Sequence, residues 1–247
     1  GNLTGGTVGG GCIVALPGSY NPISGGRYEN ETLNANRDYS DDSPVIKNNI
    51  EGLPKLSADN KKYEFTGKCG VVNGVAVWQI LNKKTNNLGG WIEKEENLSY
   101  EENAWVGGEA KIYGKARVSG DAQVYGDAQV YDGAKITGGV VRYNARISGN
   151  ARIRGGTIQG NVKITGGTVS EDANIKLNTK IFGGEILGNA EISGGVIYGG
   201  TISGNAIMFG YLEIYGGEFS GQVRVKGTAD APIIIREGVY KEGSLHN

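Results

Sequence analysis

The chain has 247 residues and a formal net charge of −1, which is enough for one large or two small domains and gives no sign of a nucleic-acid binder by charge. Glycine occurs 44 times and proline 5 times without a Gly-X-Y triplet, which excludes collagen. No apolar run of about 18 residues predicts a membrane span, and no signal peptide is recognisable at Gly1.

Residues 1–60 predict a Gly/Asn-rich arm or a loop-rich attachment region. They hold four of the five prolines and an excess of acidic residues, and their longest apolar run is Cys12–Leu16. The two cysteines, Cys12 and Cys69, are too few for a disulfide framework, so we expect two buried thiols.

Residues 61–103 predict a short β unit that forms an N-terminal cap. Tyr63–Phe65 and Val75–Ile80 alternate as strands do, and Asn73-Gly74 is typical of a hairpin turn.

Residues 104–226 carry a short repeat. Alanine recurs every six residues from Ala104 to Ala134, and an aliphatic residue stands two places after each alanine, as Val106 and Ile112 do. Residues two apart in a strand face the same way, so both point inward, and glycine supplies the bend after them. Repeated six-residue sides predict a coil of three sides, the hexapeptide β-helix.

The period then changes to an alternation of five and six residues, marked by isoleucine and by Gly-Gly pairs. If Gly-Gly absorbs a one-residue deletion at a corner, each coil holds about 16 to 18 residues. The predicted fold is therefore all-β: a single-stranded, parallel, left-handed, triangular β-helix. The rival is a four-sided right-handed helix with five residues per side. Residues 227–247 break the period at Pro232 and predict a C-terminal cap.

A family resemblance rests on residues 62–138. The chain resembles a family of bacteriophage and prophage-encoded hexapeptide-repeat proteins in three features: Leu88-Gly-Gly-Trp-Ile-Glu93, Asn103-Ala-Trp-Val106 and the Ala-Gln-Val-Tyr-Gly-Asp units. The segment that precedes the repeats in that family is matched by Lys62–Phe65 and Val72-Asn-Gly74. The resemblance implies a phage context and a left-handed β-helix, and it implies no catalytic residue.

Two enzyme classes are compatible with a β-helix. An acyltransferase of this type needs a basic histidine, and the single histidine is His246, next to the end of the sequence. A glycan hydrolase or lyase needs two carboxylates about 5–10 Å apart; the candidates are Asp121 with Asp127 and Glu171 with Asp172, although corner Asp and Asn are turn formers first. The sequence predicts no metal site and no cofactor, and its Gly-rich segments lack the helix that a phosphate loop precedes.

Binding has better support than catalysis. With about 18 residues per coil, Tyr113 stacks on Tyr131, Lys111 on Gln129 and Arg117 on Lys135, so we expect one face of tyrosines flanked by basic groups. Aromatic rings beside polar groups suit glycan or protein contacts, while the plainer interpretation is outward strand residues without a ligand. The predicted binding residues are Tyr113, Tyr125, Tyr131, Lys111, Arg117, Lys135, Arg152 and Arg154.

The sequence as a whole predicts a non-enzymatic phage structural and binding protein of tail-fibre or receptor-binding type. Its expected location is the phage particle, or the bacterial cytoplasm during infection. Expected partners are two further copies in a homotrimer, other phage structural proteins through residues 1–60, and a host surface glycan or protein. The basic stretch also suits the acidic arm of a neighbouring chain; nucleic acid and membrane are disfavoured. The alternative is a phage-encoded intracellular protein that binds a host factor.

Overall fold

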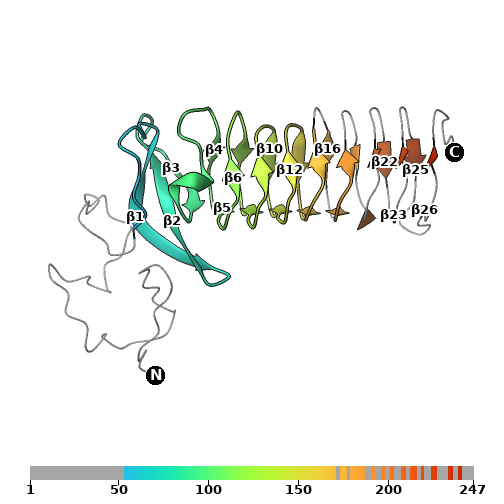
Figure 1. Cartoon of the computed structure of the whole chain (residues 1–247), viewed down its shortest axis with the longest axis horizontal. Helices are drawn as coiled ribbons and strands as arrows, with labels where there is room; N and C mark the ends of the chain where they lie inside the picture. Colours follow the sequence, from blue (N-terminus) through green and yellow to red (C-terminus); the bar gives the residue numbers. More distant parts are fainter. Residues whose placement is uncertain are drawn as a thin grey trace, which may run out of the picture.

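The chain forms a parallel β-solenoid rod with a hairpin at its N-terminal end (Figure 1). This computed structural model describes residues 53–170, 173–176 and 179–186, the strands beyond them and Tyr215. The described part holds one helical turn, the 3-10 helix η1 (Glu95–Asn97). No described helix is long and apolar enough to cross a membrane.

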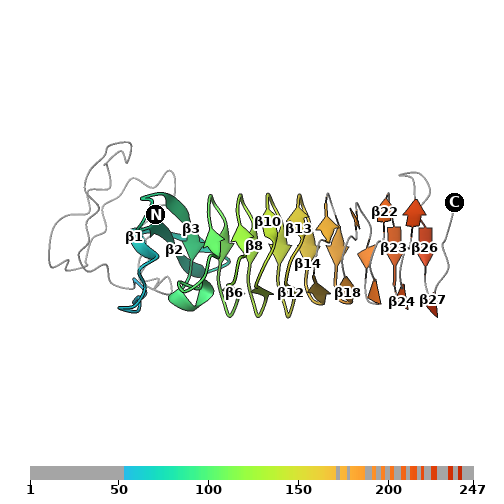
Figure 2. The ribbon, with the colours of Figure 1, turned by 90° about the horizontal axis from the view of Figure 1, so that it is seen from above.

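Three sheets run along the rod, one on each side of the coil (Figure 2). The first sheet contains, in spatial order, β1 (Tyr63–Val72), β2 (Val75–Asn82), β3 (Leu88–Ile92), β5 (Lys111–Ile112), β8 (Gln129–Val130), β11 (Arg146–Ile147), β14 (Lys163–Ile164), β17 (Lys180–Ile181), β20 (Val196–Ile197), β23 (Leu212–Ile214) and β26 (Ile233–Ile235). The second contains β4 (Trp105–Val106), β7 (Gln123–Val124), β10 (Val140–Arg142), β13 (Thr157–Gln159), β16 (Asn174–Ile175), β19 (Glu191–Ile192), β22 (Ile207–Phe209) and β25 (Arg224–Lys226). The third contains β6 (Arg117–Val118), β9 (Lys135–Ile136), β12 (Arg152–Ile153), β15 (Thr168–Val169), β18 (Glu185–Ile186), β21 (Thr201–Ile202), β24 (Glu218–Phe219) and β27 (Val239–Tyr240).

The strand register confirms the three-sided coil and excludes the four-sided rival. Lys111 pairs with Gln129, 18 residues along the chain. Gln129 pairs with Arg146, 17 residues along, and Arg152 pairs with Thr168, 16 residues along. The five-residue Gly-Gly units therefore shorten a coil at its corner without changing the number of sheets.

The core consists of stacked small and large side chains, as the repeat predicts. The alanines from Ala104 to Ala134 and the aliphatic residues from Val106 to Ile136 are all buried. Each alanine precedes a strand and fits where the walls approach each other, while Val or Ile fills the middle. Burial of this apolar surface at about 25 cal/mol per Å² is the main stabilising contribution to such a thin fold.

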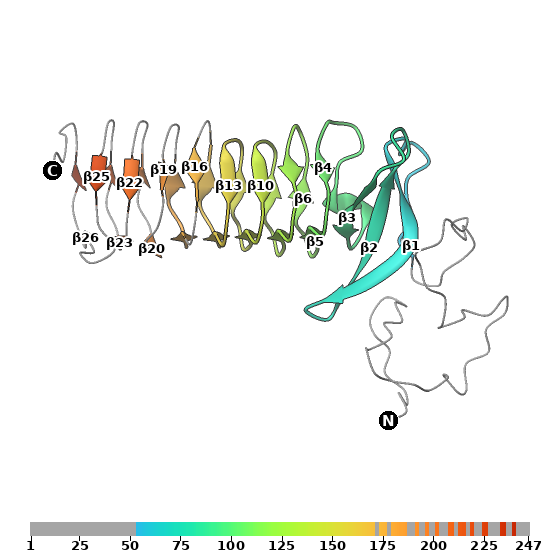
Figure 3. The ribbon, with the colours of Figure 1, turned by 180° about the vertical axis from the view of Figure 1, so that it is seen from behind.

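The β1–β2 hairpin closes the N-terminal end of this core (Figure 3). Val72 pairs with Val75 around the predicted turn, where Asn73 and Gly74 both have positive φ, 48° and 79°. Tyr63 and Trp78 are fully buried and join the same core cluster as the coil residues. The hairpin therefore covers apolar surface that the first coil would otherwise expose.

At the other end, β26 and β27 pair with β23 and β24. The sheets thus continue beyond residue 226, into the segment for which the sequence predicts a cap. Most of the N-terminal arm and His246 lie outside the described residues.

The expected pair of buried thiols is wrong for Cys69, which is disulfide-bonded and half-buried in β1. The spacing of two cysteines in a 247-residue chain carries no signal for pairing. Cys12, the chain's other cysteine, lies outside the described residues.

Tyr63 gives the cap a predictable response to pH. Its hydroxyl donates to the carbonyl oxygen of Leu98 at 2.9 Å, and burial, then the Glu95 carboxylate, raises its pKa above the usual 10.0. Because the pKa of Tyr63 is higher in the folded than in the unfolded chain, its protonated hydroxyl stabilises the fold fully below pH 10.0, and this stabilisation is lost as the pH rises above 10.0. We expect Tyr63→Phe to cost about 0.5–1.5 kcal/mol at neutral pH and to flatten the alkaline decline, as measured by urea unfolding between neutral and strongly alkaline pH. A decline of unchanged steepness in the variant contradicts this role.

Candidate binding surface

The predicted binding residues lie on different sides of the rod. Lys111 lies in β5 of the first sheet, with Tyr113 and Tyr131 one residue beyond β5 and β8. Tyr125 comes directly after β7 of the second sheet. Arg117, Lys135 and Arg152 lie in the third sheet, with Arg154 just beyond β12. The expectation of one shared face is therefore wrong, because a residue six places further along the chain lies on the next side of the coil.

Tyr113 stacks on Tyr131 as expected, with ring centroids 5.2 Å apart and planes 5° apart. However, Tyr113 is only 5% exposed, because Val72 and Val77 of the hairpin pack against it. The Asn73 side-chain amide donates to its hydroxyl at 2.9 Å, and burial raises the pKa of that hydroxyl. In this chain Tyr113 anchors the hairpin to the rod.

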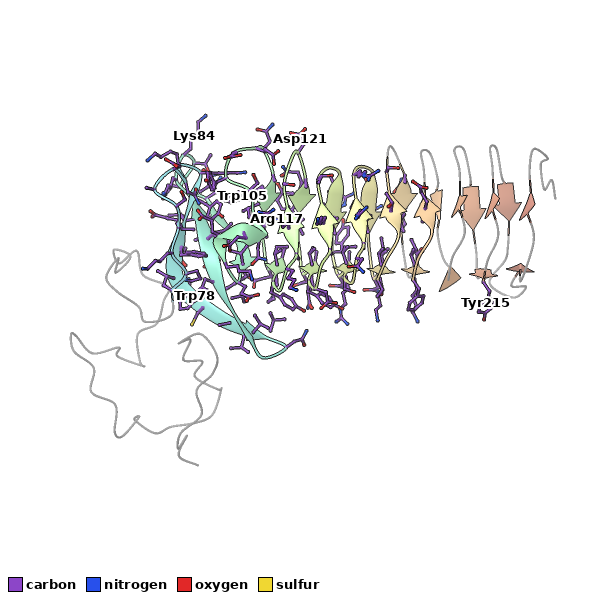
Figure 4. The ribbon with its side chains drawn as sticks, viewed as in Figure 1. Trp78, Lys84, Trp105, Arg117, Asp121 and Tyr215 are labelled. Carbon is purple, nitrogen blue, oxygen red and sulfur yellow. The ribbon has the colours of Figure 1, made fainter. Side chains whose placement is uncertain are left out.

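Three cations form a column on the third sheet, here called the cationic column: Arg117, Lys135 and Arg152. They pair directly on successive coils, and all three are exposed. Neighbouring strands lie about 4.8 Å apart, and within the described part of the chain none of the three is in an ion pair. Arg117 donates from Nε to the Glu96 carbonyl oxygen at 3.3 Å, and Thr168 ends the column. Figure 4 shows Arg117 on the surface of the rod.

The cationic column predicts a small gain in stability on neutralisation. Because like charges directly opposite each other repel, Lys135→Gln should raise the free energy of unfolding by about 0.2–1 kcal/mol at low salt. The gain should shrink as salt screens the charges. Lys115→Gln is the control, since Lys115 lies exposed in the turn between β5 and β6, outside the column. Equal effects of both variants in urea titrations contradict the repulsion.

A second surface feature, here called the aromatic corner, lies where the second sheet turns into the first: Tyr125, Arg142 and Tyr143, with Gln123 and Gln159. Tyr125 and Tyr143 are 39% and 56% exposed. Because Val124 pairs with Val141, Tyr125 lies over Arg142 on the next coil. A Cβ added at Gly107 would lie 2.8 Å from the Tyr125 ring, so this ring covers the glycine of the preceding coil. Trp105 lies beside it, near the hairpin end of the rod (Figure 4).

Hydrogen bonds hold these side chains in place. The Tyr125 hydroxyl donates to Gln123 Oε1 at 2.6 Å, and Gln123 Nε2 donates to the Asn103 carbonyl oxygen at 3.0 Å. Arg142 donates from Nε and Nη2 to Gln159 Oε1 at 3.0 and 2.7 Å. The Arg142 guanidinium carbon lies 5.4 Å from the centroid of the Tyr143 ring. Burial raises the pKa of Tyr125.

Tyr143 has an unusual backbone for its type, with φ at +61°. On the preceding coil, Gly126 stacks against the Tyr143 backbone, and Gly108 stacks against Gly126 in turn; both glycines have positive φ, 68° and 62°. Tyr143 thus stands where neighbouring coils carry glycine, and a left-handed conformation costs an L-residue roughly 1–2 kcal/mol.

The carboxylates that the sequence offers for glycan hydrolysis are separated. Asp121 precedes β7 at the corner between the third and second sheets, where it accepts from Asn103 Nδ2 at 2.8 Å. Asp127 precedes β8 at the corner between the second and first sheets. Glu171 and Asp172 lie outside the described residues. Among the described residues, no group of three or more His, Cys, Asp or Glu is placed to hold a metal ion.

Sequence reasoning included Tyr125 but missed Arg142 and Tyr143. A signal for Tyr143 was present, because the Gly of the Tyr-Gly-Asp unit at Gly126 becomes tyrosine in Arg142-Tyr143-Asn144. It was hidden by the one-residue shortening of that coil, which shifts the alignment of the repeat.

The comparisons with known proteins support the fold. The model of the YdcK beta solenoid repeat matches residues 110–126 and 145–161. The matched segments begin 35 residues apart, which equals one coil of 18 and one of 17, so both start at the same corner of the rod. No curated protein and no solved structure matches the chain. In these two segments the chain is similar to the YdcK beta solenoid repeat, and its architecture is that of a parallel β-solenoid.

Proposed function

We propose that the protein is a non-enzymatic structural and binding protein of a phage particle, of tail-fibre or receptor-binding type. In this role the solenoid is a rigid scaffold, and its outward side chains contact a host surface glycan or protein.

The observation that carries the proposal is the in-register repetition of outward residues. The cationic column places three like charges on successive coils, exposed and without an ion pair among the described residues. This arrangement gives no stability to the fold. It suits a partner that is itself repetitive, as surface polymers are.

Residues 1–60 are the proposed attachment region for other phage structural proteins, and the proposed assembly is a homotrimer with rods side by side. Light scattering tests the assembly: three times the mass of one chain supports it, and a monomer in dilute buffer contradicts it.

The alternatives are an intracellular protein that binds a host factor and a glycan-degrading enzyme or acyltransferase-like protein. The disulfide at Cys69 favours a location outside the cytosol, because disulfides persist in oxidising surroundings. Depolymerisation of host glycan that is abolished by Glu171→Gln or Asp172→Asn would favour the enzyme.

The experiment that tests the proposal is quantitative mass spectrometry of purified virions. The proposal predicts this chain among the stoichiometric structural proteins. Its presence in the infected-cell lysate and absence from virions contradicts the proposal and favours the intracellular alternative.

A further inference from the structure

We infer that the aromatic corner is a binding site for a neutral, hydroxyl-rich glycan, with Tyr143 as its central contact. The inference rests on the proposed binding function and names the site and the class of ligand.

The first argument is the backbone of Tyr143. A bulky residue at φ +61° is an outlier, and such outliers cluster at functional sites. The neighbouring coils place Gly108 and Gly126 in the same conformation without strain. Tyr143 does not offset its strain by burial, since it is 56% exposed. The left-handed backbone instead leaves a large ring exposed at the corner, one coil beyond Tyr125, with the Arg142 guanidinium carbon 5.4 Å from its centroid.

The second argument is the chemistry of the surroundings. Exposed tyrosine rings offer apolar faces for the C–H faces of a sugar, and their hydroxyls donate and accept. The Arg142 guanidinium has five N–H donors, of which its bonds to Gln159 use two, so donors remain for sugar hydroxyls. Hydrogen bonds already hold Tyr125 and Arg142, and the Arg142 guanidinium lies against the Tyr143 ring, so little freedom is lost on binding.

The third argument is the local charge. On successive coils, two residues before β8, β11 and β14, the same corner carries Asp127, Asn144 and Asn161. Asn144 Nδ2 donates to Asn161 Oδ1 at 3.0 Å. Amide and carboxylate oxygens accept from sugar hydroxyls. The exposed Asp127 carboxylate balances the charge of the exposed Arg142 guanidinium, so the corner lacks the excess of positive charge that favours single-stranded nucleic acid, even though stacked Tyr and Arg suit its bases.

Tyr143→Gly is the decisive variant, because it removes the ring and restores the residue that neighbouring coils use. Asp132→Gly is the matched control: Asp132 also has positive φ, 56°, and is exposed, but it lies beyond β8 at the corner between the first and third sheets.

The full chain and both variants are tested by biolayer interferometry against a glucan, a mannan and a galactan, with heparin and oligo(dT) as polyanions. We expect at least one neutral polysaccharide to bind, with a loss of at least about tenfold in Tyr143→Gly and no change in Asp132→Gly. The melting temperature of Tyr143→Gly should equal or exceed that of the unmodified chain.

Three results overturn the inference. A lower melting temperature of Tyr143→Gly shows that the ring serves the fold. Binding to oligo(dT) or heparin but to no neutral polysaccharide identifies a different class of ligand. Undiminished glycan binding by Tyr143→Gly overturns this site and leaves the proposed function standing. Absence of the protein from virions overturns the proposed function without affecting the binding measurement.

Discussion

Ile147→Ala is expected to lower the free energy of unfolding by about 2–5 kcal/mol. Ile147 is fully buried in β11, and its strand pairs with β8 and β14 on either side. The narrow core cannot collapse around the missing methyl groups, because the paired backbones on both neighbouring coils hold their spacing. Guanidinium titration followed by circular dichroism measures the change.

Ile147→Val is the matched control and is expected to cost about 0.5–1.5 kcal/mol, because it keeps the branched shape and removes one methylene. A cost below about 1 kcal/mol for Ile147→Ala would mean that the interior is loosely packed, which contradicts the stacked core.

Gly149→Ala is expected to destabilise the protein more than Gly108→Ala, although both glycines have φ +62°. The two variants therefore share the cost of a left-handed alanine, roughly 1–2 kcal/mol. They differ in the room available to the added Cβ. A Cβ at Gly149 would run into the Thr165 carbonyl oxygen, whereas the nearest atom to a Cβ at Gly108 is 3.2 Å away. The clash adds about 1–3 kcal/mol to Gly149→Ala alone.

The difference between these two variants, measured in the same urea titration, isolates the close approach of successive coils from the strain of the backbone. Equal costs would show that the corner at Gly149 relaxes freely, contrary to the tight stacking of the coils.

The sequence predicted the scaffold well because the residue pattern that produces each coil is local and is repeated along the chain. Ala110 and Ile112 recur with a period that places both inside, and Gly126 marks a bend between two sides of the coil. One coil then determines the next, since in-register stacking buries the same positions again. The same logic predicted Tyr113 on Tyr131.

The surface was predicted less well because it depends on contacts far apart in the sequence. Tyr113 is buried by Val72 and Val77, about 40 residues earlier, and no feature of the repeat signals that a hairpin lies over it. Tyr143 was missed because its exposure and its backbone result from a shortened coil, not from its residue type.

The two surface features make different demands on the fold. The cationic column places like charges on adjacent strands, and the aromatic corner holds a tyrosine in a left-handed conformation. Both lower stability locally, and the continuous core of the rod offsets them. This division between a stable interior and a strained surface is expected where a scaffold presents a binding site.

The central claim, that the rod binds surface glycan without cleaving it, is tested most directly by incubating the full chain with purified host surface polysaccharide. Size-exclusion chromatography then reports both co-elution of the protein and the length of the polymer. The account predicts co-elution with a polymer of unchanged length. Shortened polymer, or protein that elutes alone, would contradict it.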